Sequence, residues 1–592
     1  MSLGLSSLSI GGERPDPFPT LEPGIVSLDV EHKGLGREAR PVGIALSDAR
    51  ASHYFAFAHP EGLQYSPDAT RAYLSDVLSC RDVAFRAAKN DIEVLRRWGL
   101  DLEALGVIPH EIAHCAALLD DSRRIFTLER LAQDRLGQGK IKPLFAGRQV
   151  PPSEIPDLPS HVAAPYARRD SRLTYDLWQA YQGDIAEQKL ERVLKLEDDL
   201  LYCTLSMERA MVKLDVPKLQ RWIGEVREAY AARILEIYRR TGIRVNPNSS
   251  KDLVRLFKYL GQSFGHTLKN NPTFTDEFLN KHLDVAEIKL VSEARDLDSL
   301  LTKYLEKYLH ALLPGDMLPY QLHQLRADEF GTITGRYASS KVNTQQVFKP
   351  TKQIVVSPIT KPWIIRELFI PGSEIGWLLR FTVHDEVNGD LNGKWFHADA
   401  SQIEYRLFAH FSNVPPPHST RIIDAYKSDP NMSYHKFVHK DLLKECMIYD
   451  HAKNFNFMKL YGGGVDKAAW MLGTDDLGYV QDLLDQYDAA IPEAGQLLRY
   501  CSKLAERRGY VRTILGRRRR YSAGDRFYSA LNSVLQGSAA DLMKLKLLRL
   551  YEERKNLNSL NRLGECFMEQ EFKLRVPIAW ECSTGANWKE TL

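Results

Sequence analysis

The sequence predicts a multidomain α/β protein. Its 592 residues exceed the length, about 250–300 residues, at which a single hydrophobic core stops growing. An apolar strand pattern that carries acids opens the first 190 residues, whereas the stretch from about 190 to 310 is helical by pattern, with amphipathic runs such as 286–312. Strand patterns with tight turns return between residues 377 and 399. We therefore expect an α/β unit, a helical unit and a second mixed unit.

The composition is that of an ordinary soluble globular protein, with 44% hydrophobic and 26% charged residues. A formal net charge of +3 does not indicate a nucleic-acid partner, so any basic surface must be local. The seven cysteines include no C-x-x-C pair, which favours reduced thiols. Residues 1–12 do not resemble a signal peptide, and no apolar stretch reaches the roughly 18 residues of a membrane span. We expect a cytoplasmic protein without a membrane partner.

Two acids lie two positions apart on the first predicted strand, residues 24–31. Asp29 and Glu31 therefore project to the same face, and adjacent carboxylates repel unless a cation lies between them. The pattern D-x-E alone is a weak signal, because an exposed strand with alternating acids produces it as well. The apolar residues before Asp29 argue against a solvated face and favour a cation site.

Further polar residues of this region follow helical patterns. Asp91 enters a predicted helix that ends near Trp98, and Tyr166 and Asp170 are four positions apart, so they share a helix face. With the two strand acids, they resemble the three motifs of the 3′–5′ proofreading exonuclease domain, which has a ribonuclease H-like fold. The resemblance implies two divalent ions, Mg²⁺ or Mn²⁺, and a water molecule that Tyr166 orients. The implied metal ligands are Asp29, Glu31, Asp91 and Asp170.

One position of this resemblance departs from the family pattern. The second exonuclease motif normally has an asparagine four residues before its aspartate, where this chain has Ala87. A degenerate exonuclease fold that serves as a scaffold is therefore an alternative. We favour activity, because all four carboxylates are present.

A second acidic motif follows an apolar strand pattern at 394–399. The segment 399–404 reads Asp-Ala-Ser-Gln-Ile-Glu and begins a predicted helix that extends to residue 411. It resembles motif A of the family A DNA polymerases, the group that includes bacterial DNA polymerase I. The resemblance implies that Asp399 binds both catalytic metal ions. It also implies that Gln402 and Glu404 face the nucleotide, with Glu404 as the steric gate against a 2′-hydroxyl.

A helix with one functional face follows. Lys453, Phe457 and Tyr461 are spaced by four, and glycines from Gly462 onward end the helix. An amphipathic core helix with one lysine would look similar, but the segment resembles motif B of the same family. Lys453 would neutralise the triphosphate at the catalytic site, Phe457 would pack on sugar and base, and Tyr461 would stack at the template position. The family has arginine where this chain has Tyr449, so we expect His435, Lys436 or Lys459 to compensate, and His435 matches a histidine that faces the phosphates.

Three further segments, near residues 334–345, 509–520 and 531–537, resemble parts of the family that contact primer–template DNA. Arginine can bind phosphates and minor-groove acceptors without reading sequence, which suits an enzyme that accepts any template. A solvated basic surface is the alternative interpretation of the four arginines of 517–520, but their place next to a template site favours phosphate binding. Four residues before Asn532 the family has an arginine where this chain has Tyr528, and we expect Arg526 to compensate. The residues expected to bind DNA are Arg336, Asn343, Gln345, Arg517, Arg518, Asn532 and Gln536.

The remaining motif stands in an unusual place. His384-Asp385-Glu386 resembles motif C of the family, which normally follows motif B, yet here Asp385 precedes Asp399. No aspartate follows Asp541, which lies inside a predicted helix, 536–550. The hairpin normally found after that helix is missing, because only a short polar linker follows it. A charged turn is the alternative interpretation of the tripeptide.

Strand and turn patterns around the tripeptide support a transposed motif C. An apolar strand, 377–383, precedes it, and Asn388-Gly389 and Asn392-Gly393 offer tight hairpin turns into the motif A strand. We therefore expect the palm motifs in the order C, A, B. Asp385 would be the second catalytic aspartate and metal ligand, with His384 near the primer end and Glu386 as an auxiliary acid.

Together the motifs predict a family A DNA polymerase with 3′–5′ proofreading, which acts on primer–template DNA and deoxynucleoside triphosphates with two Mg²⁺ ions per active site. We expect a monomer, and a phage origin fits so compact a form. The alternatives are a 3′–5′ exonuclease with an impaired polymerase half and a single-subunit RNA polymerase relative. The expected units are an exonuclease domain at 1–190, a thumb at 191–320, a first palm part at 321–415, fingers at 416–520 and a second palm part at 521–592.

Overall fold

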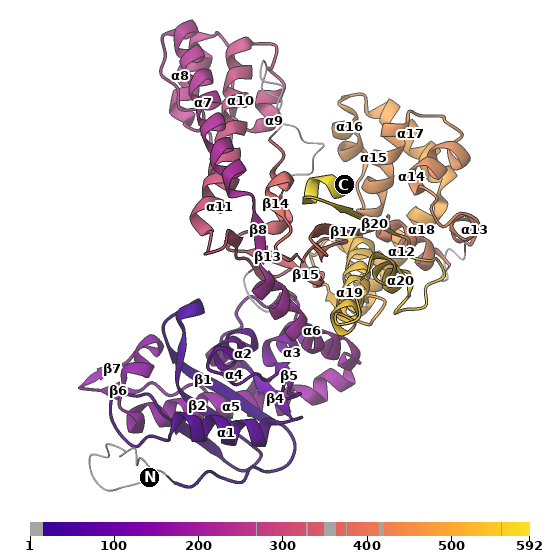
Figure 1. The fold of residues 1–592 in the computed structure, drawn as a ribbon. Helices are drawn as coiled ribbons and strands as arrows, with labels where there is room; N and C mark the ends of the chain where they lie inside the picture. Colours follow the sequence, from indigo (N-terminus) through magenta and orange to yellow (C-terminus); the bar gives the residue numbers. More distant parts are fainter. Residues whose placement is uncertain are drawn as a thin grey trace.

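The structure is a computed structural model that describes residues 16–267, 269–326, 330–347, 363–374, 376–413, 419–557 and 559–592. Residues 1–12, where no signal peptide is expected, lie outside the described residues. Figure 1 shows a sheet unit (indigo) connected by α6 (Glu191–Ala210) to a helical arm (magenta) and to a larger part that faces the arm (orange to yellow). Within the described residues, no helix is both long and apolar enough to cross a membrane.

The N-terminal unit is built on a five-stranded sheet of order β3-β2-β1-β4-β5. β1 pairs antiparallel with β2 and parallel with β4. The strands are β1 (Val26–Lys33), β2 (Arg40–Ser47), β3 (Ser52–Ala56), β4 (Asp82–Phe85) and β5 (Ile108–Glu111). The surrounding helices are α1 (Pro67–Leu78), α2 (Ala88–Arg97), α3 (Ile112–Leu119), α4 (Leu128–Leu136) and α5 (Ser160–Glu187).

Alternation along β1 sorts its side chains between two faces. Val26, Leu28 and Val30 are buried in one hydrophobic cluster, whereas the acids between and after them point to the other face. Helix α5 packs against β1, β2 and β3, and its residues Tyr166 and Ala167 join a second cluster with β2 and β3. The acids of β1 are therefore enclosed between the sheet and α5.

The helical arm consists of long helices with a separate apolar cluster near its tip. Its elements are α7 (Val216–Thr241), α8 (Ser250–Tyr259), α9 (Asp276–Asn280), α10 (Ala286–Leu300), a π-helical turn (Leu301–Leu305) and α11 (Glu306–Ala311). The amphipathic run expected at 286–312 thus forms α10, the π turn and α11 in succession. The arm is joined to the rest by β8 (Val212–Leu214), which pairs with β11 (Met317–Leu318) and β14 (Phe369–Ile370).

A four-stranded antiparallel sheet of order β15-β16-β17-β20 forms the centre of the larger part. Its strands are β15 (Trp377–Val383), β16 (Glu386–Leu391), β17 (Lys394–Ala400) and β20 (Trp580–Gly585). The first three follow one another directly in the chain. Between β16 and β17, Asn392 and Gly393 have φ of 48° and 77°, as a tight hairpin turn requires.

The prediction of a hairpin turn at Asn388-Gly389 is wrong. Asn388 and Gly389 lie inside β16, and the pairing with β15 shifts beside them, between Leu379 and Phe381. A Cβ at Gly389 would lie 2.5 Å from the Leu378 carbonyl oxygen, so close backbone approach explains this glycine. The turn before β16 is made instead by His384 and Asp385, with His384 at φ 52°.

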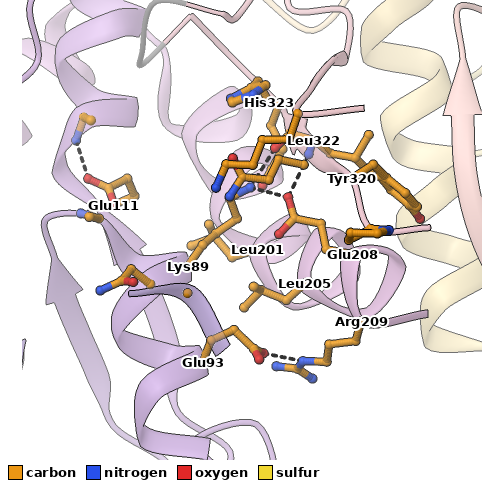
Figure 2. Close-up of a pocket in the computed structure, with 18 of the residues that line it drawn as sticks. Lys89, Glu93, Glu111, Leu201, Leu205, Glu208, Arg209, Tyr320, Leu322 and His323 are labelled. Atoms are coloured by element: carbon orange, nitrogen blue, oxygen red, sulfur yellow. Dashed lines mark hydrogen bonds and ion pairs between the residues drawn. The ribbon is translucent and has the colours of Figure 1, made fainter. Parts of the chain in front are cut away.

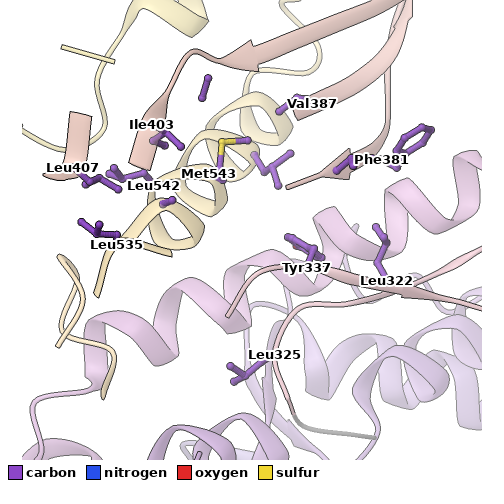
Figure 3. Close-up of a cluster of buried hydrophobic side chains, with 14 of the residues drawn as sticks. Leu322, Leu325, Tyr337, Phe381, Val387, Ile403, Leu407, Leu535, Leu542 and Met543 are labelled. Carbon is purple, nitrogen blue, oxygen red and sulfur yellow. The ribbon is translucent and has the colours of Figure 1, made fainter. Parts of the chain in front are cut away.

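A large buried cluster joins the sheet to the helices around it. Figure 3 shows Val387 of the sheet, and Ile403 and Leu407 of α12 (Ile403–Ser412), beside α19 (Ala530–Glu552), and Phe381 of the sheet belongs to the same buried cluster. Beyond it lie α13 (Arg421–Ser428), α14 (Tyr434–Phe437), α15 (Tyr449–Leu460), α16 (Val465–Leu472), α17 (Leu477–Ala490), α18 (Pro492–Arg508) and α20 (Leu560–Met568). This packing fixes the edge of the sheet relative to α12 and α15.

A buried ion network ties α6 to α19. The Lys544 ammonium donates to Glu197 at 2.6 and 2.8 Å, and the Arg517 guanidinium donates to Glu197 at 2.6 Å and to Asp541 at 2.8 Å. Burial lowers the pKa of Lys544 to about 8 against the opposing effect of Glu197. Arg517 is 3% exposed, so its position does not support the expected role in DNA binding, because its charge is used inside the protein. Asp541 lies in α19, as expected.

Replacing Glu197 with glutamine should destabilise the protein by about 3–5 kcal/mol, because two buried cations lose their shared carboxylate. Thermal or urea unfolding of the purified chain would measure the loss. Glu187→Gln, which changes an exposed acid at the end of α5, is the matched control and should leave the transition in place. Equal transitions for both variants would contradict the assigned role of the network.

Candidate active sites

An acidic cluster lies between β1 and α5 of the N-terminal unit. Ligand oxygens of Asp29, Glu31 and Asp170 lie within 4.8 Å of one another. Asp91, in the first turn of α2, is buried, and burial, together with the charges of Asp29 and Glu31, raises its pKa. The structure therefore groups three of the four acids that the sequence singled out in this unit, and the charges of Asp29 and Glu31 reach the fourth, Asp91.

The acids of this cluster destabilise one another's charge. Burial, with a further contribution from Asp170, raises the pKa of Asp29 to about 7. Burial likewise raises the pKa of Glu31 and Asp91 well above their usual range, and that of Asp170 above its usual value. Among the described residues, Asp91 Oδ2 and Asp170 Oδ1 are buried without a hydrogen-bond partner. Oxygen ligands grouped in this way fit hard divalent cations.

Two residues that the sequence did not single out shape the cluster. The Lys140 ammonium forms an ion pair with Asp170 and lies 4.7 Å from the ring centroid of Tyr166, one turn before Asp170 on α5. The Glu111 carboxylate accepts the backbone N–H groups of Ala87 and Ala88 at 2.7 Å each, so it caps α2. No local pattern marks either residue, because both act across long sequence distances.

A second group of acids lies at one end of the four-stranded sheet. Glu386 of β16 is paired in register with Asp399 of β17. The Asp385 carbonyl oxygen accepts the backbone N–H of Ala400 at 3.0 Å, so Asp385 stands at the same end of the neighbouring strand. The structure thus brings Asp385 and Asp399 to one edge, next to the turn residue His384.

Glu386 points into the protein, where it has a cationic neighbour. The Arg366 guanidinium lies 3.5 Å from its carboxylate and 3.9 Å from the ring centroid of Trp588. Burial lowers the pKa of Arg366 against the opposing effect of Glu386. Glu386 is 5% exposed, so its contact with Arg366 holds the start of β16 from the protein interior. This inward orientation does not support the expected role of Glu386 as an auxiliary acid.

Glu404, at the start of α12, is held by residues from three other segments. Its carboxylate accepts from Arg336 at 2.5 Å and from the Tyr461 hydroxyl at 2.9 Å, and Gln536 donates to that hydroxyl at 3.2 Å. The same Arg336 guanidinium lies 3.6 Å from Asp385. Hydrogen bonds therefore connect Glu404, the expected steric gate, to Tyr461 at the end of α15. They also connect it to Arg336 directly and to Gln536 through Tyr461, and both of these residues are expected to bind DNA.

Helix α15 presents its expected functional face beside this network. Lys453 and Phe457 are exposed, and the Phe457 ring lies 5.1 Å from that of His435. Burial, with the nearby Lys453, lowers the pKa of His435 to about 4, so His435 is neutral at pH 7. Lys459 forms an ion pair with Asp488 at 2.6 Å.

These contacts reduce the number of residues that could supply the positive charge that the family has at the position of Tyr449. His435 lacks the charge, and Lys459 is already paired, whereas Lys436 on α14 is exposed. The Tyr449 ring itself packs edge-on against His439 at 5.6 Å. Lys436 is therefore the candidate that the structure leaves available to bind phosphate.

Most of the other residues expected to contact DNA or nucleotide hydrogen-bond to the protein backbone. Asn343 accepts the backbone N–H of Gln345 at 3.0 Å, and Gln345 donates to the Thr382 carbonyl oxygen at 3.4 Å. Gln402 accepts the backbone N–H of Tyr434 at 2.8 Å, so its side chain supports α14. Arg518 donates to a backbone carbonyl of residue 188, and Asn532 is half-buried on α19. None of these arrangements tests nucleic-acid binding.

A family model described as DNA polymerase family A matches residues 216–563, more than half of the chain. The chain belongs to DNA polymerase family A. It is 26% identical over 602 residues to the DNA polymerase DpoZ of Acinetobacter phage SH-Ab 15497, covering 92% of this chain and 90% of the relative. It is 24% identical over 625 residues to the DpoZ of Vibrio phage phiVC8, covering 95% and 90%. This is a phage-like family A DNA polymerase.

Relatives of this family A polymerase that match over a shorter length include bacterial enzymes. The thermostable DNA polymerase I of Thermus aquaticus is 27% identical over 465 residues, which cover 71% of this chain and 51% of that protein. Among solved structures, the chain resembles the POL domain of Pol1 from M. smegmatis in complex with DNA primer-template and dNTP. That match has a TM-score of 0.74 at 20% identity and covers 96% of this chain and 95% of the other, which shows a shared fold.

Proposed function

We propose that this polymerase extends a DNA primer with deoxynucleotides through Asp385 and Asp399, with its palm motifs in the order C, A, B. The observation that carries the proposal is the strand register, because Glu386 pairs with Asp399 and Asp385 with Ala400 at one edge of the sheet. That edge faces Arg336, which lies 3.6 Å from Asp385 and 2.5 Å from Glu404. The primer–template and dNTP present in the M. smegmatis neighbour support the same substrates here.

The side chains at this edge would have distinct roles. Asp385 and Asp399 fit two divalent ions, proposed to be Mg²⁺, which when bound would activate the primer 3′-hydroxyl and neutralise the transferred phosphate. Lys453 on α15 would bind the triphosphate, and Phe457 would pack on the sugar and base. Glu404, held by Arg336 and Tyr461, would close the space that a 2′-hydroxyl needs.

We assign proofreading to the N-terminal unit. Asp29, Glu31, Asp91 and Asp170 would hold two divalent ions, and Tyr166 would orient the attacking water in phosphodiester hydrolysis. The mutual rise of the acids' pKa values supports the assignment, because cations between them would relieve the repulsion. Lys140, paired with Asp170, would occupy part of the same space until a cation displaces it.

In this proposal, residues 1–190 form the exonuclease domain and 191–320 the thumb. The palm comprises 321–415 and 521–592, with the fingers at 416–520 between them. Helix α6, assigned to the thumb by these limits, also packs on β5 and α3 of the N-terminal unit. We propose a monomer that binds primer–template DNA and deoxynucleoside triphosphates.

Replacing Glu404 with alanine should admit ribonucleotides, because removal of the carboxylate opens space beside Tyr461 and Arg336. We expect discrimination against ribonucleotides to fall at least about tenfold, which corresponds to about 1.4 kcal/mol of transition-state preference. Single-nucleotide extension with UTP and dTTP would measure the ratio. Glu445→Ala, at an exposed acid before α15, is the control, and an unchanged ratio in Glu404→Ala would contradict the gate.

A further inference from the structure

Polar side chains inside a protein need partners, and at one junction of this chain ion pairs supply them. Figure 2 shows such a pair where α2 meets α6, between Lys89 and Glu208 at 2.6 Å. His435 on α14 is not held in this way. Burial, together with a nearby cation, lowers its pKa to about 4, so the ring is neutral at pH 7. A different set of contacts fixes this ring.

A buried amide lies against one nitrogen of the His435 ring. Asn456 of α15 places its Nδ2 3.0 Å from His435 Nδ1. An amide nitrogen can donate a hydrogen bond but cannot accept one, so Nδ1 must be the acceptor and carries no proton. A neutral imidazole has one N–H group. The proton of His435 is therefore on Nε2.

Tyr487 of α17 fixes the orientation of that amide. Its hydroxyl donates to Asn456 Oδ1 at 2.7 Å. Burial raises the pKa of Tyr487 well above its usual range, and a hydrogen bond with Tyr434 opposes this rise. A bond that lowers the pKa of a tyrosine is one that its oxygen accepts, so the Tyr487 proton is left for Asn456. Oδ1 therefore faces Tyr487, and Nδ2 faces His435.

Aromatic rings hold the plane of the imidazole. The Phe457 ring lies 5.1 Å from it, and the Tyr405 ring lies 4.8 Å from it, edge-on. Asn456 is fully buried, whereas His435 is 8% exposed, and no residue in the described part of the chain forms a hydrogen bond with its Nε2. The charge of Lys453 contributes to the lowered pKa of His435, so the ring lies near the residue proposed to bind the triphosphate.

We propose that Asn456 and Tyr487 are positioning residues that hold His435 as its Nε2–H tautomer, so that a neutral N–H donor faces the triphosphate of the incoming nucleotide. Phosphate oxygens only accept hydrogen bonds, so the other tautomer would present a lone pair to them and weaken binding. The proposal rests on the proposed polymerase function. It goes beyond that function, because neither Asn456 nor Tyr487 touches the nucleotide in it.

Long-range ¹H–¹⁵N NMR of the purified chain, labelled at its histidine nitrogens, reads the tautomer without any catalytic step. The signals of His435 are those lost in His435→Gln. We expect the proton on Nε2 in the unchanged protein, and a mixture of tautomers in Asn456→Leu, because leucine has a similar size but cannot donate to Nδ1. A proton on Nδ1 of the unchanged protein would overturn the proposal.

Steady-state extension by one dTTP measures the consequence for binding. Asn456→Leu should raise KM for dTTP at least about fivefold and keep kcat within about twofold, because a contact made in both ground and transition state is weakened. In a His435→Ala background the same substitution should change KM less than about twofold, because it acts through the ring. Equal effects in both backgrounds would show a merely structural role. Tyr479→Phe, at an exposed tyrosine of α17, is the control and should leave KM unchanged.

The two measurements separate failure of this proposal from failure of the polymerase proposal. If the unchanged protein does not extend primers, the polymerase proposal fails, and the NMR tautomer alone decides the role of Asn456. If Asn456→Leu melts early, Tyr487→Phe takes its place, because it keeps the buried ring and removes only the donor to Oδ1. It should also mix the tautomers, and an unchanged Nε2–H signal would overturn the role of Tyr487.

Discussion

Asp385→Asn should reduce primer extension at least about 1,000-fold while 3′–5′ hydrolysis continues. The asparagine keeps the shape of the turn but removes the charge proposed to hold a divalent ion. Stabilisation of charge by such ions is worth several kcal/mol, and about 4 kcal/mol corresponds to about 1,000-fold in rate. Extension of a labelled primer on a longer template, with Mg²⁺ and all four deoxynucleotides, measures the effect.

The control for this variant is Asp482→Asn, which changes an exposed acid on α17. Its extension rate should equal that of the unchanged protein. Retained extension in Asp385→Asn would refute the transposed motif C and would require another second ligand. Loss of both activities in Asp385→Asn would indicate misfolding, which circular dichroism would detect.

Asp29→Asn should impair 3′–5′ hydrolysis and leave primer extension intact. We expect degradation of a single-stranded oligonucleotide to fall at least about 1,000-fold, because Asp29 lies in the group of three acids within 4.8 Å and its loss removes a proposed ligand of the ions that drive hydrolysis. Primer extension should stay unchanged, since the acidic cluster and the sheet edge belong to separate units. Gel analysis of labelled strands without nucleotides measures the loss.

Asp68→Asn, at an exposed acid on α1, is the matched control and should degrade the strand at the normal rate. Undiminished hydrolysis in Asp29→Asn would show that the exonuclease assignment is wrong. If the unchanged protein itself fails to degrade the strand, the N-terminal unit is a scaffold.

Much of the fold could be predicted because the deciding patterns are local. Alternation along residues 24–31 places Asp29 and Glu31 on one face, and the structure encloses that face under α5. The strands around His384 and the helix that begins at Tyr449 also follow from period and turn signals. Such signals depend on neighbours two to four positions away, which a single sequence contains.

The features that a single sequence does not reveal concern residues whose partners lie far away in the chain. Arg517 looked like a phosphate contact because it stands among arginines, yet its guanidinium is buried against Glu197, 320 positions away. Lys140 and Glu111 carry no local signal, although each contacts a proposed functional segment. Asn388-Gly389 resembles a turn, and only the approach of β15 shows why glycine is needed there.

The hairpin connections from β15 to β17 have a consequence for folding. Closing a tight turn costs little conformational entropy, so strands joined by such turns make contacts between residues that are close in the sequence. Such contacts form quickly. The pairing of β17 with β20, by contrast, joins Ala400 to Trp580 and must await most of the remaining chain. Because both proposed catalytic aspartates lie within the local segment, their relative placement can form early during synthesis, before the C-terminal strand exists to complete the sheet.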